Sequence, residues 1–189
     1  MRLIKYTVLI LLIALLTACG GPFTRLAKSG YANTNQGYTA SLPVGWVQAT
    51  GPESSDKLLI SKDGYSLQSI QIQALKHDKA FEKTKKTANL TMPLSDLAEQ
   101  EIAEIKATNL NAPSIKVLEN TLTTIDNKKA FRLHYQYLND RGLRFEQITY
   151  GLINAQFYYK LNYMAPTLHY FPRDKAIFEQ TVSSFKLKS

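Results

Sequence analysis

The chain contains too little cysteine to build a disulfide scaffold. Cys19 is the only cysteine among its 189 residues, so no disulfide bridge can form within the chain. Hydrophobic residues make up 44% of the sequence and charged residues 20%, which is close to an ordinary soluble protein. This balance excludes disorder along the whole chain and a collagen-like repeat. The length predicts one domain, or one domain with a tail.

The motifs that mark common catalytic and metal sites are also missing. The sequence contains neither a Gly-x-Ser-x-Gly nucleophile elbow nor a glycine loop that would cradle phosphate. The histidines, His77, His134 and His169, do not share the spacing of metal ligands. We therefore predict a protein that is not an enzyme and that holds no metal or cofactor.

Two groups of charged residues have ordinary interpretations. Three carboxylates lie on a predicted helix, opposite its apolar stripe, which predicts a solvated face rather than acid–base chemistry; they are Glu99, Glu101 and Glu104. The formal net charge is +8, and a basic run lies upstream of that helix; it consists of Lys76, Lys79, Lys83, Lys85 and Lys86. This run is either solvated charge or a surface for anionic headgroups or an acidic partner.

The first residues have the pattern of an export signal. Arg2 and Lys5 supply positive charge, and an uncharged, mostly aliphatic run extends from Tyr6 to Leu16. This run is too short to cross a bilayer, which needs about 20 apolar residues. It fits the apolar part of a secretory signal, which is about 7–15 residues long. We predict a signal peptide over residues 1–18.

The stretch Leu16-Thr17-Ala18-Cys19 resembles a bacterial lipobox. The resemblance implies cleavage between Ala18 and Cys19, a diacylglyceryl group on the Cys19 thiol and, usually, an acyl chain such as palmitate on the new amino terminus. Two or more chains anchor a protein stably where one is marginal. The alternative is an ordinary signal peptide with an incidental cysteine. In such lipoproteins an Asp directly after the cysteine retains the protein in the inner membrane. This chain has Gly20 at that position, so the retention signal is absent. The resemblance therefore implies the periplasmic face of the outer membrane in a Gram-negative source, or the outer face of a single membrane.

A tether and one domain are predicted after the signal. Residues 19–37 contain the lipidated cysteine and are rich in Gly, Ser, Asn and Thr, which favours a flexible tether with some order near Phe23 to Leu26. A single domain is predicted over residues 38–189. Because the chain is predicted to be exported and tethered by lipid, we do not expect it to bind nucleic acid.

The domain alternates apolar and polar residues over much of its second half. The alternation and short, turn-rich links predict a four-stranded antiparallel meander over residues 115–164, with a β-bulge near Glu146 and Gln147. Two further strands are predicted at 57–61 and 67–74. Apolar stripes predict helices from Ser95 to about Asn109 and from about Pro172, and residues 78–89 are a candidate for a third, short helix. Helices laid on an antiparallel sheet give an α+β fold.

Two segments that bracket the domain resemble one family. Residues 38–46, which read Tyr-Thr-Ala-Ser-Leu-Pro-Val-Gly-Trp, resemble the entry motif of PsbP-like and DcrB-like proteins. Residues 178–186 resemble their closing helix, and the strand at 158–161 fits as well. The resemblance implies an α/β/α sandwich around a central antiparallel sheet, shared with the Ran-binding Mog-type proteins. Pro43 and Gly45 would make a turn, and Trp46 would close one end of the core.

The resemblance implies binding rather than catalysis. Family members mostly dock on protein partners, chaperone hydrophobic helices or, in some mycobacterial relatives, are linked to lipid-like ligands, and no catalytic residues are shared. Our main hypothesis is a non-enzymatic accessory module that binds an envelope protein. The alternatives are a carrier for a lipid or other hydrophobic ligand, and an enzyme acting on envelope polymers.

Tyrosine is abundant, and its position suggests a binding surface. The chain has 11 tyrosines, a residue that buries area while keeping a polar tip. On the predicted strands, some side chains point away from the main aromatic face and are candidates for contact with a partner. These residues are Tyr150, Tyr158, Lys160 and His134.

Overall fold

The computed structural model describes residues 23–51, 57–108 and 115–188. The predicted signal peptide and Cys19 lie outside these residues. Within the described part, no helix is both long and apolar enough to cross a membrane.

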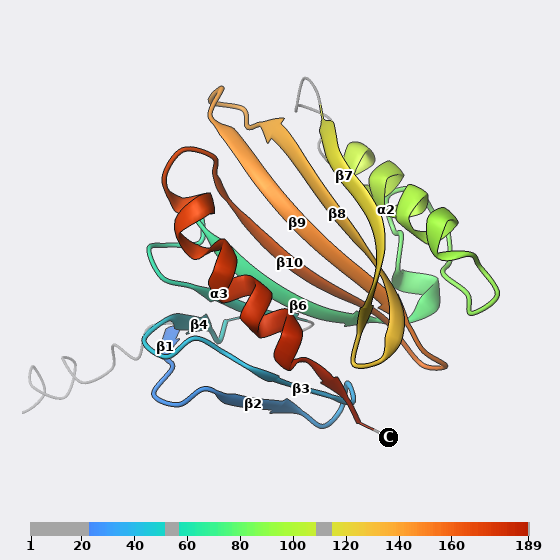
Figure 1. The fold of residues 1–189 in the computed structure, drawn as a ribbon, viewed down its shortest axis with the longest axis horizontal. Coiled ribbons are helices and arrows are strands. Elements are labelled where there is room, and N and C mark those ends of the chain that lie inside the picture. Colours follow the sequence, from blue (N-terminus) through green and yellow to red (C-terminus); the bar gives the residue numbers. More distant parts are fainter. Residues whose placement is uncertain (1–22, 52–56, 109–114, 189) are drawn as a thin grey trace, which may run out of the picture.

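An eight-stranded antiparallel sheet forms the centre of the molecule (Figure 1). Its spatial order is β1-β4-β5-β6-β10-β9-β8-β7. The strands are β1 (Phe23–Arg25), β4 (Val47–Ala49), β5 (Lys57–Ser61), β6 (Ser69–Leu75), β7 (Lys116–Ile125), β8 (Lys128–Leu138), β9 (Arg144–Ile153) and β10 (Tyr158–Pro166). The last four are consecutive neighbours, so the predicted meander is confirmed.

The turns of the meander follow their residue types. Asp126 and Asn127 have φ values of 50° and 57° and join β7 to β8, as expected for a two-residue hairpin loop with both central residues left-handed. Gly142 has a φ of 73° and closes the link between β8 and β9. Asp, Asn and Gly tolerate positive φ better than other residues, so their presence in the sequence correctly predicted these turns.

The predicted bulge in β9 is wrong. β9 pairs without interruption with both β8 and β10, and the register shift of the meander lies instead in β7, between Val117 and Glu119. The apolar set of β9 changes sides because both faces of the strand are covered. Phe145 stacks on Tyr137 on one face, while Tyr150 packs against Phe178 on the other.

Two helices cover opposite faces of the sheet (Figure 1). Helix α2 (Leu94–Thr108) packs on β7 and β8 from one side, and helix α3 (Tyr170–Ser184) packs on β10 from the other. Both helices were expected, although α3 begins at Tyr170, before Pro172. His169 makes no side-chain cap bond there, so its sequence gave no clear start. Residues 78–89 do not form an α-helix, since only the short 3₁₀-helix η2 (His77–Lys79) lies at their start.

A small second sheet lies beside α3. Its order is β11-β3-β2, with β2 (Gly30–Asn33), β3 (Tyr38–Ser41) and β11 (Lys186–Leu187). Two strands, β1 and β2, therefore lie in the segment expected to be a tether, and the folded part begins before residue 38. The turn predicted near Pro43 includes Gly45 at a φ of 85°. Trp46 is buried at 3% exposure in the core under α3, as expected.

Each face of the large sheet has its own apolar core. The core under α3 gathers aromatic side chains, and the ring centroid of Tyr163 lies 5.3 Å from that of Phe171 and 5.6 Å from that of Phe178. The core under α2 is smaller and contains Leu97, Phe131 and other buried residues. The buried residues of the two cores lie between Tyr38 and Phe185, and Leu26 and Tyr31 pack against the core under α3. An α/β/α sandwich around an antiparallel sheet is thus the observed fold.

Candidate functional site

A polar groove lies beside α2, over the strands that the helix leaves open. It has a volume of about 260 Å³ and is continuous with a neighbouring pocket of about 420 Å³ through shared lining residues. Residues of β6, α2, β8, β9 and β10 line it. Its polar side chains include Gln71, Gln73, Glu101, Glu104, Lys160 and Asn162, and Ile105, Tyr135, Tyr137 and Met164 also line it. We call this site the polar groove.

The register of two central strands builds the floor of the polar groove. β6 and β10 pair so that Gln73 lies opposite Lys160, and Gln71 lies opposite Asn162. Alternate residues of a strand share a face, so all four lie on the same face of the sheet. The other face of the same strands is apolar and belongs to the core under α3. Each strand therefore presents its apolar side to α3 and its polar side to the groove.

Glu101 is a buried carboxylate at the wall of the polar groove. Its side chain is 1% exposed. Lys160 Nζ lies 2.9 Å from its Oε1, and the Tyr158 hydroxyl donates to its Oε2 at 3.0 Å. A buried charge needs a partner of this kind, because removal from water costs several kcal/mol per ion. Burial, and then the charge of Glu101, raise the pKa of Tyr158 well above its usual value, so the phenol stays a hydrogen-bond donor.

Glu104 holds the segment that leads into α2. Its Oε1 accepts a hydrogen bond from the Lys83 amide at 2.7 Å, and its Oε2 accepts from the Thr84 amide at 2.8 Å and from the Thr84 hydroxyl at 2.9 Å. The expectation of a solvated acidic face is therefore wrong for Glu101 and Glu104, which are 1% and 8% exposed. The helix turns these carboxylates inward because the sheet and the preceding segment supply donors to them.

Asn162 carries an unsatisfied polar atom in the polar groove. The residue is 8% exposed, and within the described part of the chain its Oδ1 accepts no hydrogen bond. A buried acceptor without a partner costs about 1–3 kcal/mol. Asn162 sits on a central strand and lines the groove together with Gln71 and Gln73. The atom itself has almost no exposed surface, so a ligand with a hydrogen-bond donor would satisfy it only after the amide turns toward the groove.

The four predicted binding residues lie on two opposite faces of the sheet. Tyr158 and Lys160 are on the α2 side, where Lys160 lines the polar groove. Tyr150 and His134 are on the α3 side. The expectation that the two tyrosines are exposed is wrong, because Tyr158 is 0% and Tyr150 is 7% exposed. Tyr158 is buried in the core under α2, and Tyr150 is covered by α3, where it packs against Phe178.

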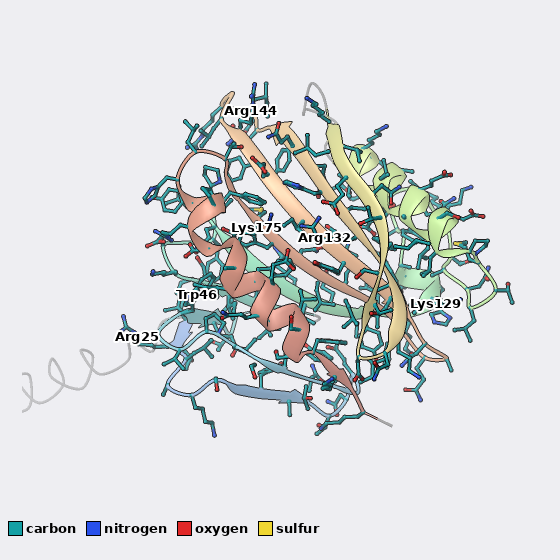
Figure 2. All side chains as sticks on the ribbon, in the orientation of Figure 1. Arg25, Trp46, Lys129, Arg132, Arg144 and Lys175 are labelled. Carbon is teal, nitrogen blue, oxygen red and sulfur yellow. The ribbon has the colours of Figure 1, made fainter. Side chains whose placement is uncertain are left out.

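Tyr150 belongs to a network that fastens α3 to the sheet. Its hydroxyl donates to Glu179 Oε2 at 2.6 Å and accepts from Arg132 Nε at 2.9 Å. Arg132 also bonds to Glu119 of β7, and its Nη2 lies 3.3 Å from Glu179 Oε1. Figure 2 shows Arg132 on the face of the sheet that α3 crosses. Burial, followed by the bond to Glu179, raises the pKa of Tyr150. This network links helix to sheet.

His134 has a similar structural role. Its ring stacks on Phe171 of α3 with the centroids 5.3 Å apart, and its Nε2 lies 2.6 Å from Glu146 Oε2. Gln136 donates to the other oxygen of Glu146 at 3.1 Å. Of the two predicted alternatives, a surface histidine or a histidine covered by a helix, the structure confirms the second for His134.

Sequence reasoning missed Gln71, Gln73, Glu101 and Asn162 as site residues. A signal was present, since β6 and β10 each alternate apolar residues with amides or lysine. This pattern is typical of a half-exposed sheet. It predicts a polar face, but not that a helix would border that face and turn it into a groove.

Comparison with known proteins gives the family and the fold. The PsbP family matches residues 28–187. No curated protein sequence matches the chain. Solved structures share the fold at low sequence identity, and three of them, each covering most of the chain, illustrate the match.

The cyanobacterial PsbP of Synechocystis sp. PCC 6803 has a TM-score of 0.64 and 14% identity, with 90% of this chain and 97% of that chain covered. The Ran-binding protein Mog1p of Saccharomyces cerevisiae has a TM-score of 0.57 and 10% identity, with coverages of 86% and 96%. A Pseudomonas aeruginosa protein of unknown function has a TM-score of 0.54 and 13% identity, with coverages of 89% and 99%. Because the family match spans most of the sequence and the fold agrees with it, this chain belongs to the PsbP family.

Proposed function

We propose that this protein is a lipid-anchored, non-enzymatic binding module of the bacterial cell envelope, and that the polar groove receives an uncharged segment of a partner protein. The observation that carries the groove's role is the unsatisfied Oδ1 of Asn162. The lipobox at residues 16–19 supports the anchor. A solved relative of the same fold is named for binding the protein Ran, which is consistent with a docking role for the fold.

The charges of the polar groove favour binding over catalysis. Both oxygens of Glu101 and both oxygens of Glu104 already face donors within the protein. The lysine of the groove is paired with Glu101 as well. A general base needs a carboxylate that can take a proton from a substrate. A groove whose charges are compensated internally instead suits a neutral ligand.

The spacing of the amides suits an extended polypeptide. Gln71 and Gln73 are two residues apart on β6, which places them about 6.8 Å apart along the strand. An extended peptide repeats its backbone amides on one side at the same interval. Amide side chains both donate and accept, so they can pair with either half of a peptide group. A peptide laid along β6 and β10 would also offer a donor to Asn162.

The carrier hypothesis has less support. Most residues that line the polar groove are polar, and only Ile105, Tyr135, Tyr137 and Met164 are apolar or aromatic. A site for an acyl chain is instead lined mostly by apolar side chains. Native mass spectrometry of the chain from residue 20, purified without detergent, tests this alternative. A co-purifying lipid mass would favour the carrier.

Photocrosslinking tests the partner. A benzoyl-phenylalanine in place of Gln73, in the full-length lipoprotein in its own envelope, is expected to trap a protein. Asn162→Leu removes the amide at similar volume and is expected to lower this crosslinking severalfold. Because it also removes an unsatisfied buried acceptor, it should leave the unfolding free energy equal or higher.

The matched control places the crosslinker at Leu122, which is 67% exposed on β7 and away from the groove. If the Asn162→Leu variant crosslinks as well as the parent, or if Leu122 traps the same protein equally, the groove is not the docking site.

Cys19→Ser tests the anchor separately. It should abolish incorporation of labelled palmitate, and incorporation that persists would refute lipidation at Cys19.

A further inference from the structure

Two leucines project from one end of the large sheet. Leu168 is 94% exposed and Leu143 is 45% exposed. Leu143 lies in the loop between β8 and β9, and Leu168 lies between β10 and α3. Together with Arg144 and Pro166 they line a groove of about 310 Å³. We call these four residues the leucine tip, and Figure 2 shows Arg144 at its end of the molecule.

The leucine tip is held in a fixed shape. Asn139 Oδ1 accepts hydrogen bonds from the amides of Arg141 and Leu143 at 3.0 and 2.9 Å. The two loops are tied together, since the Thr167 amide donates to the Arg144 carbonyl at 3.1 Å. The exposed leucines therefore stand on an ordered support. Loop ends usually carry polar residues, so a supported pair of exposed leucines indicates a contact surface.

Basic side chains outnumber acidic ones at the leucine tip and in the loop that carries Leu143. Arg141 and Arg144 are both exposed, and Arg144 also lines a second groove with Lys116. The acidic residue of the β8–β9 loop is Asp140. Exposed apolar side chains next to basic ones match the interface of an anionic membrane, where headgroups attract the charge and acyl chains accept the leucines. From this complementarity we propose that the leucine tip inserts into the surface of an anionic lipid bilayer.

The shape and position of the tip favour a bilayer over a protein. A stable protein interface buries about 800 Å² on each partner, which two leucines on loop ends do not supply. In Figure 1 the β10–α3 loop and β1 lie toward the left of the picture, and the β8–β9 loop lies at the top. Cys19 is four residues before Phe23, a reach of at most about 14 Å. A lipid on Cys19 would keep the domain close to a bilayer, and tethering makes even a weak contact effective.

Vesicle co-sedimentation tests the proposal without the anchor. The chain from residue 20 contains every paired strand and both cores, so it carries the complete fold. It is expected to sediment with vesicles of phosphatidylethanolamine and phosphatidylglycerol at millimolar lipid, and much less with phosphatidylcholine. The double variant Leu143→Asp/Leu168→Asp should lose at least tenfold in partitioning. Arg141→Gln and Arg144→Gln should each lose about fivefold, on anionic vesicles only.

The matched control is Leu90→Asp, at a loop leucine that is 56% exposed and outside the tip. It should partition like the parent. The proposal is overturned if the parent chain ignores anionic vesicles, if Leu90→Asp loses as much as the double variant, or if the tip variants change the mass of the particle in solution, which would assign the leucines to a contact between copies. Unchanged urea midpoints show that the variants are folded. Since the chain used lacks the anchor and Asn162 is untouched, failure here leaves the proposed function standing.

Discussion

At the scale of single residues, Gly151 has less room for a side chain than the other glycines compared in the described part of the chain, which are Gly30, Gly37, Gly45, Gly64 and Gly142. Gly151 lies on β9, opposite Phe131 of β8 and Lys160 of β10. A Cβ there would lie 2.2 Å from Cζ of Phe131 and 3.0 Å from the Tyr158 hydroxyl oxygen. The absence of a side chain lets the Phe131 ring lie across the strand and fill the core under α2. The polar groove depends on this packing, because Tyr158 supports Glu101.

Gly151→Ala is expected to destabilise the protein by about 1–3 kcal/mol or more, because Phe131 is fully buried and must move. Urea unfolding measures the change. Gly30→Ala is the matched control, since Gly30 is also in a strand and a Cβ there meets nothing within 4 Å. Equal midpoints for the two variants would show that the core under α2 yields to an added methyl group.

At the scale of elements, one aspartate fastens the last strand. The Leu187 amide donates to Asp126 Oδ2 at 2.9 Å, and Lys186 Nζ lies 3.1 Å from Oδ1. Asp126 belongs to the β7–β8 turn, so this contact joins the large sheet to the C-terminal strand of the small one. The bond from the Leu187 amide, and then Lys186, lower the pKa of Asp126 below its usual 3.8.

This contact predicts a loss of stability in acid. The pKa is lower in the folded state than in the unfolded chain, so the ionised carboxylate stabilises the fold fully above about pH 4. That contribution is lost as pH falls through the folded pKa. Asp126→Asn keeps a residue that tolerates a positive φ and still offers an acceptor to Leu187. The difference in urea midpoint between pH 7 and pH 3 should be smaller in this variant than in the parent, and an equal difference would contradict the assignment.

At the scale of the whole molecule, one sheet carries two cores. Strands β8, β9 and β10 contribute side chains to the core under α2 from one face and to the core under α3 from the other. A change in either core therefore alters the common sheet. Trp46 is the only tryptophan and is buried under α3, so its fluorescence reports on one core alone.

Leu97→Ala tests whether the cores unfold together. Leu97 is fully buried on α2, and its truncation should cost about 2–5 kcal/mol. If the molecule is one cooperative unit, the midpoint seen by Trp46 fluorescence should shift as far as the midpoint seen by far-UV circular dichroism. A Trp46 transition that stays in place while the circular dichroism transition moves would show two independent units.

Much of the fold was predictable from the sequence because its signals are local. Alternation in β8 and β10, turn residues such as Asn127 and Gly142, and the apolar stripes of α2 and α3 are each set within a few residues. Two predictions failed for local reasons: the first residue of α3 was not identified, and a bulge was wrongly predicted in β9. His169 is not a capping type, and the side switch in β9 reflects cover on both faces rather than an extra residue.

The sequence by itself determined the antiparallel meander, the two helices, the α+β class and a likeness to the PsbP family, since these depend on periodicity and on short motifs. The tertiary structure alone decided the binding geometry. Whether Glu101 meets solvent or Lys160 depends on where α2 sits over β10, and whether Tyr150 is exposed depends on α3 lying across β9. These contacts join residues far apart in the chain, and alternation within a strand tells which face a side chain takes but not what covers that face.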